Sequence, residues 1–396
     1  MSKKIVPILD TKCVAPYVST QINASGLLKV CCEYKDSPNI LPYTEFDRWW
    51  NSDLDQLRKD LNNNVQHELC SNCWNKESID YHSYRNNLNQ IYKNDYDNYD
   101  NLYNQSSHSL PKHVHLNFGN MCNLRCIMCH PAYSSSLHTE VKLNSASYNQ
   151  FFSEVHLGQK DRYISPDANY SSLWFKDKSF KELAQKLLKN ADRIFLTGGE
   201  PLMSAESFNT INEIENKKNI DLVITTNGTL LDTKWFELFV KFKSINITVS
   251  LEGIDRANNY LRHGSDWTTI DQNIKKIQNL HNLDSMQIAT VIQHTSYYTI
   301  SELLSYADTL NIPLNITLLF APEYLSINTL TKEEIDNFIS MLKSIDSTYN
   351  KSVITSLLNF LTKDYVYDSQ SRKHFFAYVA MLDSIRGTNF KETFNL

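Results

Sequence analysis

Three cysteines lie close together in the chain, at Cys122, Cys126 and Cys129 in the segment MCNLRCIMCH. A loop this short can place three thiolates around one iron–sulfur cubane, whereas such clusters usually take four cysteine ligands. Three protein ligands leave one iron open, and an open iron can bind and break a small molecule. A structural zinc site is the alternative, but it closes four ligands and commonly pairs its cysteines. The spacing therefore predicts an open cluster, with zinc as the competing interpretation.

The C-x3-C-x2-C spacing resembles the cluster loop of the radical S-adenosylmethionine (SAM) superfamily. The resemblance implies a 4Fe-4S cluster whose open iron chelates the amino and carboxylate groups of SAM. One electron then cleaves SAM to methionine and a 5′-deoxyadenosyl radical. The residue before the last cysteine is commonly aromatic in that family, and here it is Met128. Because a thioether is apolar and adaptable, Met128 is a candidate to pack against the adenine.

The segment TGGEP, which contains Gly198, Gly199 and Glu200, directly follows an expected strand. Paired glycines let backbone groups approach a ligand closely. The resemblance implies that this segment receives the amino group of SAM. Glu200 either anchors that ammonium or accepts hydrogen bonds from local backbone amides.

A second polar segment, SLEG, contains Ser250 and Glu252 and resembles the SxDG segment of the family, with Glu252 where aspartate is commoner. The resemblance implies contacts to the ribose and the carboxylate of SAM. Arg262 is a candidate partner for the SAM carboxylate, because a guanidinium presents a planar fork to carboxylates. The alternative for Arg262 is an exposed surface position.

Five further cysteines precede this loop, and four of them have a distinctive spacing: Cys13, Cys31, Cys70 and Cys73. The C-x12-G-x4-C spacing through Gly26 resembles the opening of twitch and SPASM modules. That resemblance implies an auxiliary 4Fe-4S cluster with four cysteine ligands, and it leaves Cys32 as a spare or alternative ligand. A zinc knuckle is the competing interpretation. In most relatives this module follows the barrel, whereas here it comes first.

Six strand-like apolar runs with helical patterns between them must position these motifs. Such alternation implies a parallel sheet, and the resemblance implies a partial (β/α)6 TIM-type barrel. The cysteine loop, TGGEP and SLEG follow the first, second and fourth strands, at the carboxyl ends where barrel enzymes carry their active sites. The expected strands are 113–118, 193–197, 222–226, 245–251, 287–292 and 314–320.

The composition along the chain suggests four regions. Residues 1–88 hold the cysteine-rich module, with a hairpin turn at 24–26. Residues 89–111 are polar and almost free of aliphatic side chains, so we predict a linker there. The expected radical SAM core domain is 112–325, and the helical pattern of 326–396 indicates a C-terminal helical cap.

An aromatic-rich stretch between the first two barrel strands allows two interpretations. It is either a substrate-facing lid or packing against the barrel wall. Its aromatic residues are Tyr148, Phe151, Phe152, Tyr163, Tyr170, Trp174 and Phe175.

The remaining composition narrows the class of protein. The chain has 396 residues and a formal net charge of −5, without a run of lysine and arginine that would track phosphates, so no nucleic-acid partner is evident. No stretch approaches the roughly 18 apolar residues of a membrane span, and the N-terminus lacks a signal-peptide pattern. We therefore expect a cytoplasmic protein whose cysteines bind metal clusters instead of forming disulfides.

The leading hypothesis is a radical SAM enzyme that abstracts hydrogen from a peptide or protein, leading to oxidation, crosslinking or epimerisation. The same chemistry on a sugar, nucleotide or amino-acid-derived metabolite is the first alternative. A non-catalytic iron–sulfur or zinc protein is the second. The resemblance also implies a low-potential electron donor such as flavodoxin or ferredoxin. No side chain is assigned a catalytic role beyond cofactor binding.

Overall fold

The computed structural model describes residues 10–37, 40–78, 82–105, 108–155 and 173–396. Its strands are β1 (Ser19–Ile22), β2 (Leu28–Lys29), β3 (His113–Asn117), β4 (Arg125–Cys126), β5 (Arg193–Thr197), β6 (Asp221–Thr226), β7 (Ser244–Ser250), β8 (Arg262–His263), β9 (Leu283–Ile292) and β10 (Leu314–Leu318). Eight of them form one sheet in the order β10-β9-β7-β6-β5-β3-β1-β2, and β4 pairs separately with β8. All neighbours in the large sheet are parallel except β1 and β2.

The six strands predicted from the sequence are confirmed as β3, β5, β6, β7, β9 and β10. Helices connect them in sequence, so the fold is mixed α/β with a parallel sheet, consistent with a TIM-type barrel. The connecting helices are α8 (Ser135–Leu143), α9 (Ser145–Glu154), α10 (Lys178–Asn190), α11 (Ala205–Asn212), α12 (Thr233–Phe239), α13 (Asp255–Leu261), α14 (Trp267–Gln278) and α15 (Ser296–Thr309).

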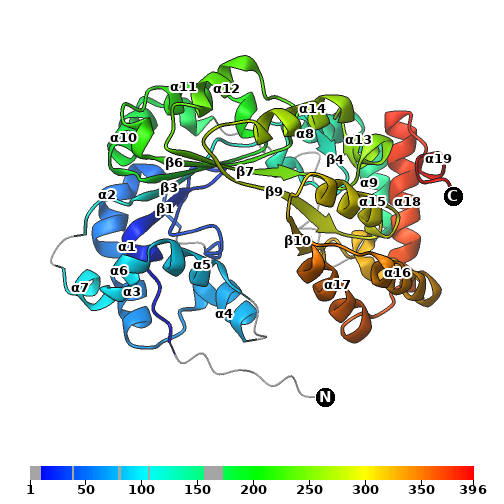
Figure 1. Cartoon of the computed structure of the whole chain (residues 1–396), viewed down its shortest axis with the longest axis horizontal. Helices are drawn as coiled ribbons and strands as arrows, with labels where there is room; N and C mark the ends of the chain where they lie inside the picture. Colours follow the sequence, from blue (N-terminus) through cyan, green and yellow to red (C-terminus); the bar gives the residue numbers. More distant parts are fainter. Residues whose placement is uncertain (1–9, 38–39, 79–81, 106–107, 156–172) are drawn as a thin grey trace.

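The two faces of the sheet differ in chemistry because side chains alternate along each strand. On β3, Val114 and Leu116 join the main hydrophobic core with side chains of α10, α12 and α14. These helices lie together on one side of the sheet in Figure 1. The opposite face of β3 carries His113 and His115, which are also buried. The face of β3 that points away from the main hydrophobic core is therefore polar.

The N-terminal hairpin belongs to the same sheet as the barrel strands. β1 pairs in parallel with β3, with Ser19 opposite His113, while β2 returns antiparallel to β1. The predicted turn at 24–26 is confirmed, and Gly26 adopts the positive φ of +78° that a tight turn favours. The cysteine-rich segment thus extends the barrel sheet at its first strand.

The predicted linker differs from the structure, because most of it is helical and packed. Tyr92 and Tyr99 are buried, and the Asn89 side chain accepts a hydrogen bond from the Val14 amide at 3.0 Å. A few widely spaced apolar side chains are enough to dock these short helices on the N-terminal segment. The helices of this half are α1 (Ala15–Val18), α2 (Phe46–Arg48), α3 (Asp55–Asn62), α4 (Ser71–Glu77), α5 (Tyr84–Ile91), α6 (Lys93–Asp97) and α7 (Tyr99–Tyr103).

The aromatic-rich stretch packs inward wherever it is described. Tyr148 and Phe151 of α9 are buried in a second hydrophobic cluster. Trp174 and Phe175 are buried in the main core, and the Trp174 indole N–H donates to the Ala24 carbonyl at 2.9 Å. These side chains support the packing interpretation, while residues 156–172, with Tyr163 and Tyr170, lie outside the described part of the chain.

The chain after β10 is helical, with α16 (Lys332–Ser344), α17 (Lys351–Lys363), α18 (Ser369–Arg386) and α19 (Phe390–Phe394). Figure 1 shows the N-terminal helices at the β1 side of the sheet and these C-terminal helices at the opposite side, near β9 and β10. Within the described ranges, no helix combines the length and the apolar character needed to cross a membrane.

Candidate active site

The three predicted cysteines come together immediately after β3. Cys122 and Cys126 are buried with Leu124 in a small cluster, and Met128 and Cys129 pack against it. The first turn of α8 closes the loop: Ser134 Oγ donates to the Leu124 carbonyl at 2.6 Å, and Ser136 Oγ donates to the Cys122 carbonyl at 2.7 Å. Sequence reasoning missed that serines at the start of α8 hold the cysteine loop.

The chemistry of these thiols fits a metal-cluster ligand set. All eight cysteines of the chain are free. Burial raises the pKa of both Cys122 and Cys129 to about 12, and it also raises the pKa of Cys126. A buried thiol needs a compensating positive charge to ionise, and metal binding supplies that charge while releasing the protons. The three side chains therefore suit a cationic cluster better than thiolate chemistry of their own.

The glycine segment packs directly against the cysteine loop. The Gly199 amide donates to the Gly119 carbonyl at 3.0 Å, and the Glu200 amide donates to the Met121 carbonyl at 2.7 Å. A Cβ on Gly199 would lie 2.5 Å from the Met121 carbonyl oxygen, which no side chain can tolerate. Gly199 is therefore required by its contact with the backbone of the cysteine loop. Gly198, with φ of +154°, precedes this contact.

The Glu200 carboxylate accepts its hydrogen bonds from neighbouring groups of the protein. It accepts hydrogen bonds from the Leu202 amide at 3.0 Å, the Thr226 hydroxyl at 2.8 Å and the Asn227 amide at 2.7 Å. Burial raises the pKa of Glu200 to about 7, and these three bonds oppose the rise. Of the two roles considered from the sequence, the structure favours the satisfaction of local amides.

Glu252 and Arg262 form a buried ion pair beside the cysteines. Arg262 Nη2 donates to Glu252 Oε1 at 2.8 Å, and its Nη1 lies 3.8 Å from the sulfur of Cys126. The other oxygen of Glu252 accepts from the Thr290 hydroxyl and the Val291 amide. Arg262 is only 12% exposed, so the alternative of a surface arginine is wrong. The pairing of β4 with β8 explains the contact, because it places Cys126 opposite Arg262.

Arg262 also keeps an unused donor. Its Nε is buried and finds no hydrogen-bond partner among the described residues. Asn117, at the end of β3, has an equally unpartnered buried Oδ1, which lies 3.5 Å from where a Cβ of Gly198 would be. A donor and an acceptor left unsatisfied next to the cysteine loop indicate a site for a polar ligand. Sequence reasoning missed Asn117, although its position at a strand end was a usable signal.

The other two predicted contacts lie close to this group. Ser250 is the last residue of β7, half-buried, and two positions before Glu252. Met128 is half-buried between the cysteine cluster and the hydrophobic cluster that contains α18. The sequence also missed Asn123, whose side chain links the cysteine loop to Asn227 and Thr229 at 3.0 and 2.9 Å.

The four N-terminal cysteines also converge, although they come from separate segments. One apolar cavity is lined by Cys13 before α1, Cys31 after β2, and Cys70 and Cys73 at α4. Cys32 does not line it and is exposed. Burial raises the pKa of each of the four thiols. Further cavity residues that the sequence did not single out include Tyr34, Trp74, Tyr84 and Arg85.

Neither cysteine group forms a ready site for a single metal ion. Among the residues that the structure describes, no three His, Cys, Asp or Glu side chains are arranged to hold one metal ion. In a 4Fe-4S cluster each thiolate binds a different iron, so its ligands stay further apart than those of one zinc ion.

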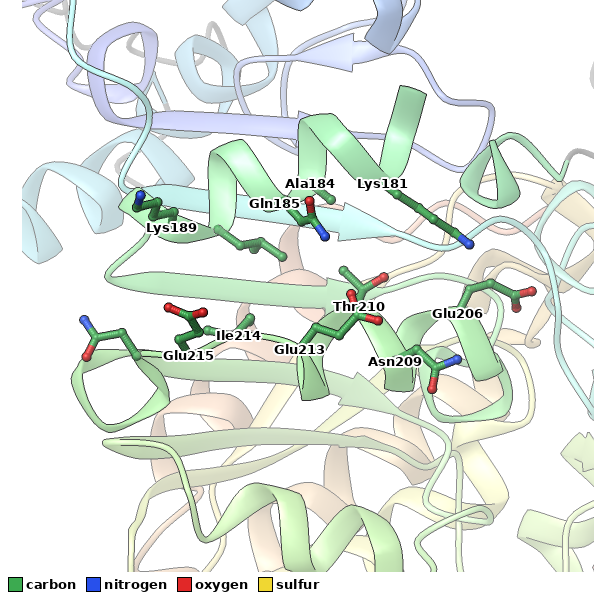
Figure 2. A pocket seen from close by; sticks show the side chains of 12 residues that line it. Lys181, Ala184, Gln185, Lys189, Glu206, Asn209, Thr210, Glu213, Ile214 and Glu215 are labelled. Carbon is green, nitrogen blue, oxygen red and sulfur yellow. The ribbon is translucent and has the colours of Figure 1, made fainter. Parts of the chain in front are cut away.

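A larger cavity lies elsewhere and has a different character. About 640 Å³ of space separates α10 from α11, with none of the predicted site residues in its lining. Figure 2 shows Lys181 and Lys189 of α10 on one side of it and Glu206 and Glu213 on the other. Its mixed charge and its distance in sequence from the cysteine motifs separate it from the candidate active site.

Residues 116–306 match the family described as the radical SAM superfamily. This chain contains a radical SAM domain. The match spans the cysteine loop, the glycine segment and the Glu252–Arg262 pair, and this domain family implies a 4Fe-4S cluster and SAM as cofactors. No curated protein matches the chain.

Solved structures resemble this chain only distantly. SuiB of Streptococcus suis bound to the precursor peptide SuiA is 17% identical over 96% of this chain and 77% of SuiB, with a TM-score of 0.38. Native anSMEcpe with bound AdoMet is 15% identical over 64% of this chain, with a TM-score of 0.37. This chain covers 63% of anSMEcpe, less than two thirds of its length. Likenesses this weak carry no argument about substrate.

Proposed function

We propose that Cys122, Cys126 and Cys129 hold the 4Fe-4S cluster and that SAM binds beside it, between the glycine segment and Arg262. When bound, the cluster and SAM supply a 5′-deoxyadenosyl radical by one-electron cleavage. The observation that carries this proposal is Arg262, which touches Cys126 with one nitrogen, is held by Glu252 with another, and has its Nε free. A carboxylate is the ligand that such a guanidinium favours.

The roles of the other side chains follow from their contacts. Glu252 orients Arg262 and keeps its buried charge compensated. Glu200 fixes the glycine segment against the loop that contains Asn227, so we infer that it shapes the pocket without meeting the ligand. Asn117 Oδ1 is then the acceptor best placed for the SAM amino group. Ser250 and Met128 remain the candidates for the ribose and the adenine.

We infer further that Cys13, Cys31, Cys70 and Cys73 bind an auxiliary 4Fe-4S cluster in a module that spans residues 1–88. A fully ligated cluster has no open iron, so its chemistry is electron transfer. Its position supports a role in the reaction: Tyr84 lines the four-cysteine cavity, and its hydroxyl lies 3.5 Å from His113 Nε2 on the polar face of β3. The four-cysteine cavity therefore adjoins the polar face of β3 at His113, the first residue of that strand.

A peptide or protein is the substrate class that we propose first, with oxidation, crosslinking or epimerisation as the reaction. The support is the resemblance of the N-terminal spacing to modules whose enzymes often act on peptides. Candidate peptides incubated with the loaded enzyme would be examined by mass spectrometry for loss of two hydrogens or for deuterium incorporation.

The test of the proposed function needs no substrate. Anaerobically reconstituted protein with dithionite and SAM should release 5′-deoxyadenosine and methionine slowly, and Cys126→Ala should abolish the release. Cys32→Ala is the matched control and should leave it unchanged, because Cys32 is exposed and outside both cysteine groups. If intact, cluster-loaded protein binds no SAM, the proposed function fails.

A further inference from the structure

The C-terminal helix α18 touches the cysteine loop through a buried hydrogen bond. The Tyr378 hydroxyl donates to the carbonyl of Ile127 at 3.1 Å, although the two residues are 251 positions apart. Ile127 lies between Cys126 and Cys129, and its side chain is buried in one hydrophobic cluster with α18. The match to the radical SAM family ends at residue 306, so this contact comes from outside the matched domain.

A charged group anchors the end of the same helix. Arg386 donates to both carboxylate oxygens of Glu140 on α8, with a shortest distance of 2.8 Å, and both side chains are only 2% exposed. Glu140 also accepts from the Tyr148 hydroxyl at 2.9 Å and pairs with Arg125 at 3.3 Å. Arg125 is the residue before Cys126. The anchor of α18 therefore reaches the cysteine loop from a second direction.

The helix also holds the strand that carries Arg262. Asp383 of α18 accepts a hydrogen bond from the Tyr260 hydroxyl at 3.0 Å. The next residue, Leu261, accepts from the Ile127 amide at 2.9 Å through its carbonyl. In Figure 1, α18 runs beside α9 and α13, which flank these segments. Through Tyr378 and Asp383, α18 thus contacts residues that adjoin both β4 and β8.

We propose that α18 is part of the cluster-binding unit and that Tyr378 is a positioning residue for the SAM-binding cluster. The inference rests on the proposed function, because it assumes a cluster at the three cysteines. Tyr378 and the Glu140–Arg386 pair hold the Cys126–Cys129 turn and Arg262 in one fixed arrangement. Removal of the Tyr378 hydroxyl loosens that arrangement without touching any cluster ligand.

The physical effect follows from the geometry of one peptide group. A trans peptide is planar, with its C=O and N–H on opposite sides. When Tyr378 fixes the Ile127 carbonyl toward α18, it also fixes the Met128 N–H away from that helix. Without the hydroxyl, the buried Ile127 carbonyl loses its hydrogen-bond partner, and this loss of free energy favours another conformation of the Cys126–Cys129 turn. Backbone orientation around a cluster influences its potential and its retention.

The test compares Tyr378→Phe with Tyr365→Phe in the full-length holoenzyme. Tyr365 makes the same kind of bond, from its hydroxyl to the Leu330 carbonyl at 2.6 Å, away from the cysteines. The measurements are the rate at which a chelator removes iron and the electron paramagnetic resonance (EPR) spectrum of the reduced cluster with and without SAM. Tyr378→Phe should release the SAM-sensitive cluster about fivefold faster, the factor for roughly 1 kcal/mol, and should alter its spectrum.

Each outcome decides between the possibilities. Equal release rates and spectra for Tyr378→Phe, Tyr365→Phe and the unmodified protein overturn the proposal. If Tyr378→Phe does not fold, Arg386→Lys takes its place, since lysine keeps the charge of Arg386 but not its bonds to both oxygens of Glu140. Arg386→Lys should then show the same faster release, and a normal rate would overturn the proposal. An unmodified protein without any SAM-sensitive signal contradicts the proposed function itself.

Discussion

The two cysteine groups of this chain are built in different ways. The three-cysteine loop is local, within eight residues after one strand, and its neighbours are charged: Arg262 lies 3.8 Å from Cys126 and is paired with Glu252. The four-cysteine group is assembled from separate segments around an apolar cavity with Tyr34, Trp74 and Tyr84 in its lining. Three cysteine ligands leave one iron open, and the unpartnered Nε of Arg262 lies in the ion pair beside them, so this group suits the binding of an exchangeable ligand. Four cysteines suit a closed cluster because no iron is left without a protein ligand, although Arg85 and Glu33 also line this cavity. We therefore propose SAM activation at the first group and electron transfer at the second.

The largest effect should come from removing the local group. The triple variant Cys122→Ala, Cys126→Ala and Cys129→Ala should lose about four of about eight irons and all cleavage of SAM, because no ligand remains for the open cluster. Iron analysis and 5′-deoxyadenosine chromatography on anaerobically reconstituted protein provide the measurement. Zinc in anaerobically purified unmodified protein, with no iron uptake, would contradict the comparison for both groups.

Removal of ligands from the four-cysteine group should remove iron but spare SAM cleavage. Cys70→Ala with Cys73→Ala should also remove about four irons, yet should leave slow SAM cleavage in place, since a closed cluster is not needed to bind SAM. Circular dichroism must show that the double variant is folded, because a cluster can stabilise a small module. Loss of SAM cleavage in folded double variant would mean that electrons reach SAM through this group.

Gly199 offers a sharper perturbation of the local group. Gly199→Ala places a Cβ 2.5 Å from the Met121 carbonyl oxygen, so the cysteine loop must move, and we expect less than half of its iron to be retained. Asn311→Ala is the control, because Asn311 is exposed and alanine at its φ of +56° costs about 1 kcal/mol without crowding the cysteine loop. If both variants retain iron equally, the close packing of the glycine segment does not position the cysteines.

The smallest effect concerns Glu200 and the pH. Its pKa of about 7 in the folded protein exceeds the ordinary 4.5, so the folded state binds this proton more tightly than the unfolded chain. The contribution to stability is therefore full below about pH 4.5 and is lost as the pH rises through about 7. Between pH 5 and pH 7 the free energy of unfolding should fall by about 2 kcal/mol more in the unmodified protein than in Glu200→Gln.

Urea titrations of the apoprotein across this range would measure the difference. Glu182→Gln serves as the control, because the side chain of Glu182 is 64% exposed. It should follow the pH dependence of the unmodified protein. Parallel profiles for Glu200→Gln and the unmodified protein would show that Glu200 ionises normally in the folded state.

The sequence was most informative where the determinants are local. The strand-like apolar runs predicted the six strands β3, β5, β6, β7, β9 and β10. Composition did not indicate the short helices α6 and α7 in the predicted linker, because they dock through a few buried side chains such as Tyr92 and Tyr99.

Contacts between distant segments could not be predicted. The pairing of Cys126 with Arg262 depends on two-residue strands 136 positions apart. The addition of β1 to β3 depends on the register of the whole sheet. The ring of contacts around Glu140 joins α8 to a helix 246 positions later. Single-sequence periodicity carries no information about which of these elements will meet.

The most direct test of the account is the EPR spectrum of the reduced, fully reconstituted protein before and after addition of SAM. Two cluster signals should be present, of which one shifts with SAM and the other does not. Cys126→Ala should abolish the signal that shifts, and Cys70→Ala with Cys73→Ala should abolish the other. A single signal, two signals that both ignore SAM, or a SAM-sensitive signal that survives Cys126→Ala would contradict the assignment of an open and a closed cluster.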